Sequence, residues 1–199
     1  MECDKIKLEN YIIKDFVDEN SKVLELGCGS GELLQLLHSE KNADVQGLEI
    51  NEECIRECIK RGVPVLHGDI ESGLSEYSDN SFDYVILEQT FQELKNADAV
   101  IQNALKIGNK VIVSFPNFAY YKSRIQMFFL GKSPVTKTLP YVWYNTPNLH
   151  FLSILDFAGY CNDRNIVVED KKFIAGNRPV NLFPNLFAEI GIFVISKKI

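Results

Sequence analysis

A glycine-rich segment and a set of acidic residues carry the chemistry that this sequence could perform. Gly27-Cys-Gly-Ser-Gly31 follows a hydrophobic run and precedes a helical pattern. Glycine lets the main chain turn sharply and approach a ligand, and the N–H groups of a helix start then point at that ligand. The acidic residues stand near the ends of successive predicted strands, and they are Glu25, Glu49, Asp69 and Glu88. This order predicts a cofactor held at one edge of a parallel sheet.

The spacing of the glycines and acids indicates which cofactor. Dinucleotide sites have the wider spacing Gly-x-Gly-x-x-Gly, which accommodates a pyrophosphate. The tighter Gly-x-Gly-x-Gly of this chain suits S-adenosylmethionine (SAM), which has no phosphate. Glu49 lies 18 residues after Gly31, where a carboxylate can accept hydrogen bonds from both ribose hydroxyls. Asp69 could accept from the adenine amino group, and Ser30 is expected to cap the helix. The alternative for each acid is a turn residue or a helix cap.

The elements that must position these residues alternate between strands and helices, which is typical of a parallel sheet covered on both faces. The predicted helices are Glu32–His38, Glu52–Lys60 and Ala97–Lys106, after an amphipathic stretch at Ile6–Val17. The predicted strands are Lys22–Leu26, Val45–Ile50, Val63–His67, Tyr84–Glu88, Lys110–Phe115, Ile166–Phe173 and Ile192–Lys197. We therefore expect an α/β fold with a seven-stranded, mostly parallel, doubly wound sheet in a three-layer α/β/α sandwich, the last two strands forming a hairpin edge.

These motifs resemble the class I SAM-dependent methyltransferases over nearly the whole chain. The resemblance implies a Rossmann-like fold in which Glu25 and Gly27–Gly31 hold the methionine part of SAM, Glu49 the ribose, and Asp69 with Ile70 the adenine. S-adenosylhomocysteine would be the product of any methyl transfer. The cofactor-binding residues expected on this basis are Glu25, Gly27, Cys28, Gly29, Gly31, Glu49, Ile50, Asp69, Ile70 and Glu88.

A narrower resemblance concerns four strings in the second half of the chain. They are Leu87-Glu-Gln-Thr-Phe-Gln92, Ser114-Phe-Pro-Asn-Phe118, Gly131-Lys-Ser-Pro-Val-Thr-Lys-Thr-Leu-Pro-Tyr141 and Trp143-Tyr-Asn-Thr-Pro-Asn-Leu-His150. They look like the MetW family of methionine-biosynthesis proteins, although Glu88 departs from the small residue expected there. The resemblance implies a SAM-binding protein that acts with, or regulates, homoserine O-acetyltransferase.

The alternative function is a SAM-dependent methyltransferase that acts on a small molecule, which could bear a carboxylate. The candidate catalytic bases are His150, Tyr144 and Glu88. For His150, capping of a following helix or packing against a neighbouring aromatic ring is the favoured interpretation. Arg124 and Lys137 could hold a substrate carboxylate, or they could form a solvated basic face.

Composition bounds the class of protein. The 199 residues are 46% hydrophobic and 24% charged, which suits a single globular domain spanning residues 1–199. We expect a cytoplasmic protein without membrane association, because no apolar run is long enough to span a bilayer and the first residues do not resemble a secretory signal. The five scattered cysteines suggest reduced thiols and no metal site.

Charge is distributed unevenly along the chain. The net charge of −6 argues against a nucleic-acid partner. Residues 1–98 hold 22 acidic and 9 basic residues, whereas residues 99–155 hold six bases and no acid. This acid-free stretch contains an aromatic insertion at about 117–150, expected over the cofactor's reactive end. It is either a partly buried insertion or a surface that meets an acidic partner or a carboxylate.

Overall fold

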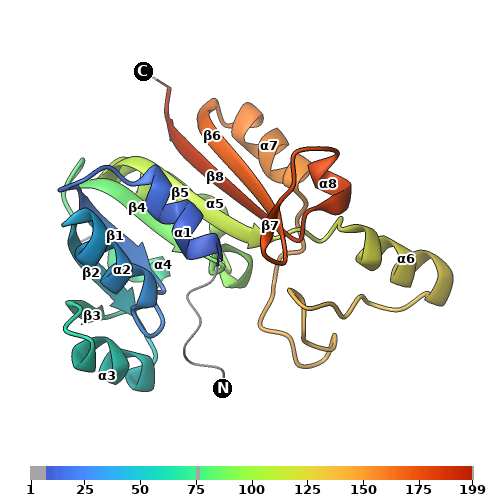
Figure 1. Ribbon diagram of the computed structural model, residues 1–199, viewed down its shortest axis with the longest axis horizontal. Helices are drawn as coiled ribbons and strands as arrows, with labels where there is room; N and C mark the ends of the chain where they lie inside the picture. The colour runs from blue at the N-terminus through green and yellow to red at the C-terminus, as the bar shows by residue number, and fades with distance from the viewer. Residues whose placement is uncertain (1–7, 75–76, 199) are drawn as a thin grey trace.

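The computed structural model describes residues 8–74 and 77–198, which form an eight-stranded sheet between helices (Figure 1). The strand order is β3-β2-β1-β4-β5-β8-β6-β7. Strands β1 to β5 are parallel, whereas β8 runs antiparallel to both β5 and β6. The strands are β1 (Lys22–Leu26), β2 (Asp44–Glu49), β3 (Val65–His67), β4 (Phe82–Glu88), β5 (Gly108–Pro116), β6 (Ile166–Ala175), β7 (Arg178–Pro179) and β8 (Ile190–Lys197).

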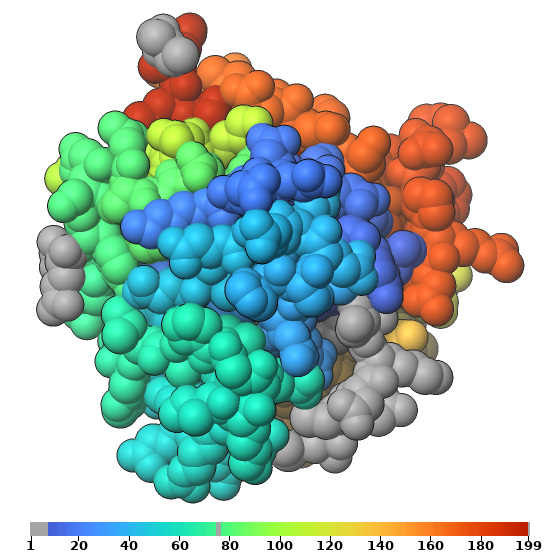
Figure 2. Space-filling model, turned by 60° about the vertical axis from the view of Figure 1, so that its left-hand side comes forward, coloured from blue at the N-terminus to red at the C-terminus, as the bar shows by residue number. Residues whose placement is uncertain are grey.

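Helices cover the two faces of this sheet. Helices α1, α2 and α3 pack on one face, and Figure 2 shows α1 and α2 side by side there. Helices α5 and α7 pack on the other face. The helices are α1 (Leu8–Phe16), α2 (Glu32–Lys41), α3 (Glu52–Lys60), α4 (Ile70–Gly73), the 3₁₀ helix η2 (Phe91–Glu93), α5 (Ala97–Ile107), α6 (Tyr121–Leu130), α7 (Ile154–Asp163) and α8 (Pro184–Phe187). Among the described residues, no helix is long and apolar enough to cross a membrane.

The two-residue period of a strand divides the core into two parts. In β1, Val23 packs with α1 and α2, whereas Leu24 and Leu26 pack with the side chains under α5 and α7. Each of these side chains is fully buried or nearly so, and burial of one such residue contributes about 1.5–3 kcal/mol. The same alternation places Glu25 on the face of Val23, toward α1 and α2.

The predicted fold class is confirmed, and three details of the prediction are wrong. An eighth strand, β7, pairs with β6 and forms the outer edge, so β8 lies inside the sheet rather than in an edge hairpin. Strand β3 begins two residues later than predicted, just after Pro64, which has no N–H for a sheet hydrogen bond. Ser30 does not cap α2; Gly31 holds that position with φ of 77° and no side-chain cap.

Residues 117–150 leave the sheet after β5 and project from the body of the molecule (Figure 1). They begin with α6 and continue as irregular chain. The segment is anchored near its two ends, because Phe118 N–H donates to the Leu152 carbonyl at 3.0 Å, and the N–H groups of Leu149 and His150 donate to the Gln92 carbonyl. Ser153 then caps α7 through a capping box with Asp156.

We predict that Ser153→Ala lowers the free energy of unfolding by about 1 kcal/mol, the usual loss for an N-cap serine. The Ser153 hydroxyl accepts from Asp156 N–H at 3.2 Å and donates to its carboxylate at 2.7 Å. Urea unfolding measures the change. Ser133→Ala, at an exposed loop position, serves as the control. Equal stability of the two variants would contradict the cap.

Candidate functional site

Three glutamates meet at the carboxyl edge of the sheet. Glu25 of β1 lies opposite Gly47 of β2 and Ile86 of β4. Glu49 and Glu88 follow these two partners by two residues, so the strand period places all three carboxylates on the same face. The sequence predicted that these acids share an edge, and the register shows that they also share a side.

The glycine loop connects β1 to α2 at this edge. Gly27, Gly29 and Gly31 all have positive φ values, between 52° and 77°. A Cβ at Gly27 would lie 2.8 Å from Thr90 Oγ1, so a larger residue does not fit there. At Gly29 no described heavy atom beyond the adjacent residues lies within 4 Å of that position, so the absent side chain leaves space beside the loop.

The Glu49 carboxylate fixes the glycine loop to β2. Its Oε2 atom accepts from the Gly29 N–H at 2.9 Å. Its Oε1 atom accepts from the N–H groups of Ile50 and Asn51, both at 2.8 Å. Asn51 in turn caps α3 with its side chain. Glu49 is therefore buried and oriented before any ligand binds, while Ile50 beside it is 63% exposed.

No ion pair neutralises the buried carboxylate of Glu25 within residues 8–74 and 77–198. It is 2% exposed, and its Oε2 atom has no hydrogen-bond partner among the described residues. Burial raises the pKa of Glu25 well above its ordinary value, and the negative charges of Glu88 and Glu49 raise it further. A cation next to this carboxylate would remove the cost of ionising it.

The thiols of Cys28 and Cys58 pack against the glycine loop. The Sγ atoms of Cys28 and Cys58 lie 3.9 Å apart, and Cys58 Sγ donates to the Gly29 carbonyl at 3.2 Å. Burial raises the pKa of both thiols, and the charge of Glu25 adds to this effect on Cys28. Both therefore stay protonated and act as small packing groups.

The structure places the residues expected for adenine at the same edge. Asp69 follows β3 and is exposed; its Oδ1 atom caps α4 by accepting from Glu71 N–H at 2.9 Å. Helix capping is the alternative that the sequence left open for this acid. The cap uses Oδ1 and leaves Oδ2 available. Ile70 is partly buried, with its Cδ1 atom 3.3 Å from the Cβ position of Gly27.

The three candidate bases are not brought together. Glu88 is close enough to Glu25 to raise its pKa. The main chain of His150 is held beside η2 by its 3.0 Å bond to Gln92, but its side chain is exposed. Tyr144 is 73% exposed on the projecting segment, edge-on to Trp143.

The two residues considered for a substrate carboxylate also lie apart from the glutamates. Arg124 on α6 donates from Nε to the Ala119 carbonyl and from Nη2 to the Asn185 carbonyl. Lys137 is exposed on the projecting segment.

Polar residues at the start of α1 join the site and were missed in the sequence. Glu9 and Asn10 are 1% and 4% exposed, and the Gln89 side-chain amide donates to the Glu9 carboxylate. Gln89 and the buried Gln92 directly follow β4. The sequence did contain a signal for the burial of Glu9. It lies four residues before Ile13, so the two side chains share the buried face of α1.

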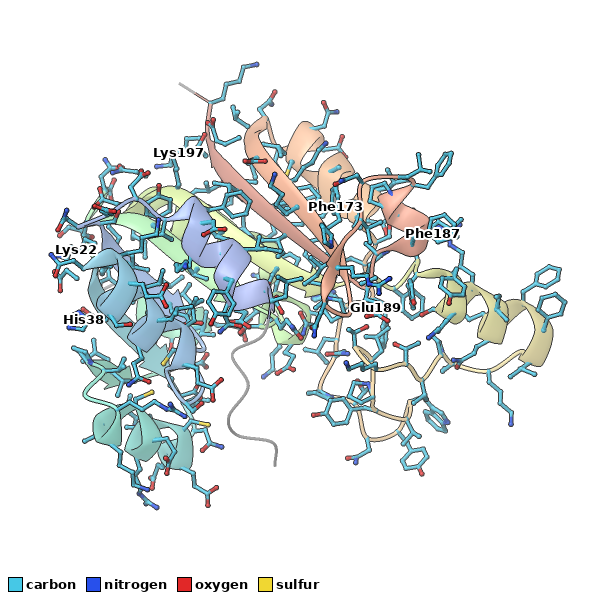
Figure 3. All side chains as sticks on the ribbon, in the orientation of Figure 1. Lys22, His38, Phe173, Phe187, Glu189 and Lys197 are labelled. Atoms are coloured by element: carbon cyan, nitrogen blue, oxygen red, sulfur yellow. The ribbon has the colours of Figure 1, made fainter. Side chains whose placement is uncertain are left out.

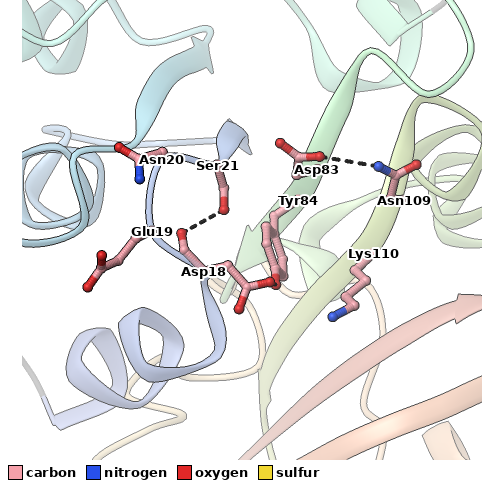
Figure 4. A pocket seen from close by; sticks show the side chains of 8 residues that line it. All are labelled: Asp18, Glu19, Asn20, Ser21, Asp83, Tyr84, Asn109 and Lys110. Atoms are coloured by element: carbon pink, nitrogen blue, oxygen red, sulfur yellow. Dashed lines mark hydrogen bonds between the residues drawn. The ribbon is translucent and has the colours of Figure 1, made fainter.

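A cavity of about 360 Å³ lies at the opposite, amino edge of the sheet (Figure 4). Its polar groups already pair with one another. Asp83 accepts from the Lys22 N–H and from the Asn109 side chain, and the Tyr84 hydroxyl donates to Asp18 at 2.7 Å. These bonds connect strand starts, so we assign this cavity a structural role.

Comparison with known proteins identifies the family. The model of the family described as methionine biosynthesis protein MetW matches residues 7–195. The chain belongs to the MetW family. It is also 31% identical over 177 residues to the bifunctional methionine biosynthesis protein MetXA/MetW of Rhodopirellula baltica. That match covers 84% of this chain and 28% of the relative, so the MetW chain spans less than a third of that protein.

Solved structures share the fold of this MetW-family chain. An S-adenosylmethionine-dependent methyltransferase from Mesorhizobium loti matches with a TM-score of 0.69 and 13% identity, over 94% of this chain and 97% of the other. The [4+2]-cyclase SpnF matches with a TM-score of 0.68 and 12% identity, over 96% and 81%. The fold is therefore that of class I methyltransferases, and a cyclase shares it, so the fold alone does not specify methyl transfer.

We predict that Glu25→Gln makes the protein more stable than wild type at pH 8 and less dependent on pH. The folded pKa of Glu25 lies above its ordinary value of 4.5, so between these values the folded chain holds more protons than the unfolded chain. Stability contributed by Glu25 therefore falls as pH rises through that window. Urea unfolding from pH 5 to pH 8 measures it, with exposed Glu19→Gln as the control. Parallel curves for wild type and Glu25→Gln would contradict the raised pKa.

Proposed function

We propose that this chain binds SAM at the carboxyl edge of β1, β2 and β4, and that the bound chain regulates homoserine O-acetyltransferase. The observation that carries the first part is the pair of buried glutamates beside an open glycine loop. Membership of the MetW family supports a role in methionine biosynthesis. The structural neighbours include SAM-dependent proteins with the same fold.

The residues at this edge fit the chemical groups of SAM. When bound, SAM supplies a sulfonium and an ammonium, both cations. The Oε2 atom of Glu25, which has no hydrogen-bond partner among the described residues, is an acceptor suited to a cation. At Gly29 the missing side chain leaves space for close approach. Glu49 stands at the tip of β2, where a ribose can reach it, and the exposed side chain of Ile50 offers an apolar surface for the adenine.

We expect Glu49→Ala to weaken SAM binding by roughly 1–3 kcal/mol, or about 5- to 150-fold. The substitution removes the ribose acceptor and also releases the Gly29 N–H that orients the loop. Isothermal titration calorimetry measures the affinity. Glu53→Ala, an exposed acid on the next helix, should bind SAM as wild type does. If Glu49→Ala retained full affinity, Glu49 would not belong to the site.

The acetyltransferase is proposed as partner on two grounds. The strings at 87–150 resemble a family associated with homoserine O-acetyltransferase. The Rhodopirellula baltica relative carries MetXA and MetW in one bifunctional protein, and such a fusion keeps two partners together at high effective concentration. A binding module needs the same cofactor contacts as an enzyme but no catalytic base, and the three candidate bases here are scattered.

The test is the acetylation rate of homoserine O-acetyltransferase from the same organism, with and without this chain, at several SAM concentrations. We expect the chain to change the rate severalfold and the change to depend on SAM with the affinity found by calorimetry. The Glu49→Ala variant should shift that dependence to higher SAM concentration. An unchanged rate would overturn the regulatory role and would favour instead a methyltransferase of small carboxylate-bearing molecules.

A further inference from the structure

The segment that projects from the body carries a large exposed apolar surface. We call residues 121–151 the arm. Seven of the ten residues of α6 are exposed, and Phe128 and Phe129 are 83% and 72% exposed. The exposed apolar residues of α6 are Ile125, Met127, Phe128, Phe129 and Leu130. Figure 3 shows side chains of the arm pointing away from the rest of the molecule. Apolar surface gathered in this way marks an interaction site.

The apolar residues surround α6 instead of forming one stripe. At 3.6 residues per turn, the five side chains from Ile125 to Leu130 point in all directions around the helix axis. A helix that is apolar all round is a buried helix. A membrane surface covers only one side of a helix and needs a polar face on the other. The first half of α6 already packs on the body, because Ser123 is buried and the Tyr121 ring contacts Phe187. The occupant must therefore cover the second half of α6 on more than one side, as a groove of another protein does.

The charge of the arm limits the partner further. Residues 121–151 contain no acid, and their bases are Lys122, Arg124, Lys132 and Lys137. A cavity of about 460 Å³ lies between the base of α6, α7 and α8. Its walls include the apolar residues Ile154 and Phe193 and the basic residues Arg124 and Lys171. The arm joins this surface through the contact between the Tyr121 and Phe187 rings. The arm and the cavity lining contain basic and apolar residues and no acid among the described residues.

A second copy of this chain does not offer a surface complementary to the arm. Its cavity presents Arg124 and Lys171, which repel a basic arm. In its acidic half, the exposed apolar side chain of Ile59 shares one face of α3 with Glu52 and Arg56, which form a surface ion pair. Enclosing Phe128 there would bury apolar rings against charged groups.

We propose that the arm docks into an apolar, acid-rimmed groove of the homoserine O-acetyltransferase, an inference that rests on the function proposed above. The rings of Phe128 and Phe129 fill the groove, and Lys132 and Lys137 face its acidic rim. Large aromatic anchors supply most of the binding energy in such interfaces, and the charges mainly speed association.

The decisive comparison uses two double variants that each remove two exposed apolar side chains. Phe128→Ser/Phe129→Ser alters the arm, whereas Tyr11→Ser/Ile59→Ser alters α1 and α3. We expect the arm variant to bind the acetyltransferase at least 30-fold more weakly, and the control to stay within about twofold of wild type. Both should retain wild-type SAM affinity by calorimetry, which shows that they are folded. Lys132→Glu/Lys137→Glu should slow association, with an effect that shrinks as salt increases.

Each other outcome overturns the proposal in a recognisable way. If the arm variant binds the acetyltransferase as wild type does, the docking surface is wrong and the regulatory function stands. If wild type does not bind the enzyme at all, both fail. If the arm variant loses only self-association, or only binding to phosphatidylserine vesicles, the arm serves a second copy or a membrane instead.

Discussion

The carboxylate of Glu49 connects the glycine loop, the second strand and the third helix of this protein. It accepts hydrogen bonds from the N–H groups of Gly29, Ile50 and Asn51, and Asn51 caps α3. A buried carboxylate is stable only when such donors replace its lost water. The loop and the strand ends around it must therefore keep this geometry, and the rest of the site is built around a group that is already oriented.

Glu25 represents the opposite situation at the same edge. Its carboxylate is buried with an unpaired oxygen and two negative neighbours, Glu49 and Glu88. Such a group costs folding stability unless a proton or another cation accompanies it. The arrangement is physically reasonable if a cationic ligand belongs to the site. A cationic ligand that binds only the folded chain would offset this cost.

The molecule also separates its two kinds of surface. The acidic half contains β1 to β4, which provide the three carboxylates at the carboxyl edge of the sheet. The basic, aromatic arm follows the carboxyl end of β5, where Ser114 pairs with Glu88 of β4. Near its end, the N–H groups of Leu149 and His150 donate to the Gln92 carbonyl of η2. Because η2 follows β4, this connection links the arm to the end of the strand that carries Glu88.

The sequence by itself determined the fold class, the glycine loop and the order of acids along the edge. Those features depend on local rules: two-residue and 3.6-residue periodicity, and the conformational freedom of glycine. Local rules did not show that Gly31 rather than Ser30 precedes α2 as its N-cap, that Glu9 is buried against Gln89, or that the second half of α6 is exposed. Only the tertiary structure decided these points, because burial and hydrogen-bond partners are set by residues far away in the chain. Glu9 and Gln89 are separated by 80 positions, and no pattern within either segment records their contact.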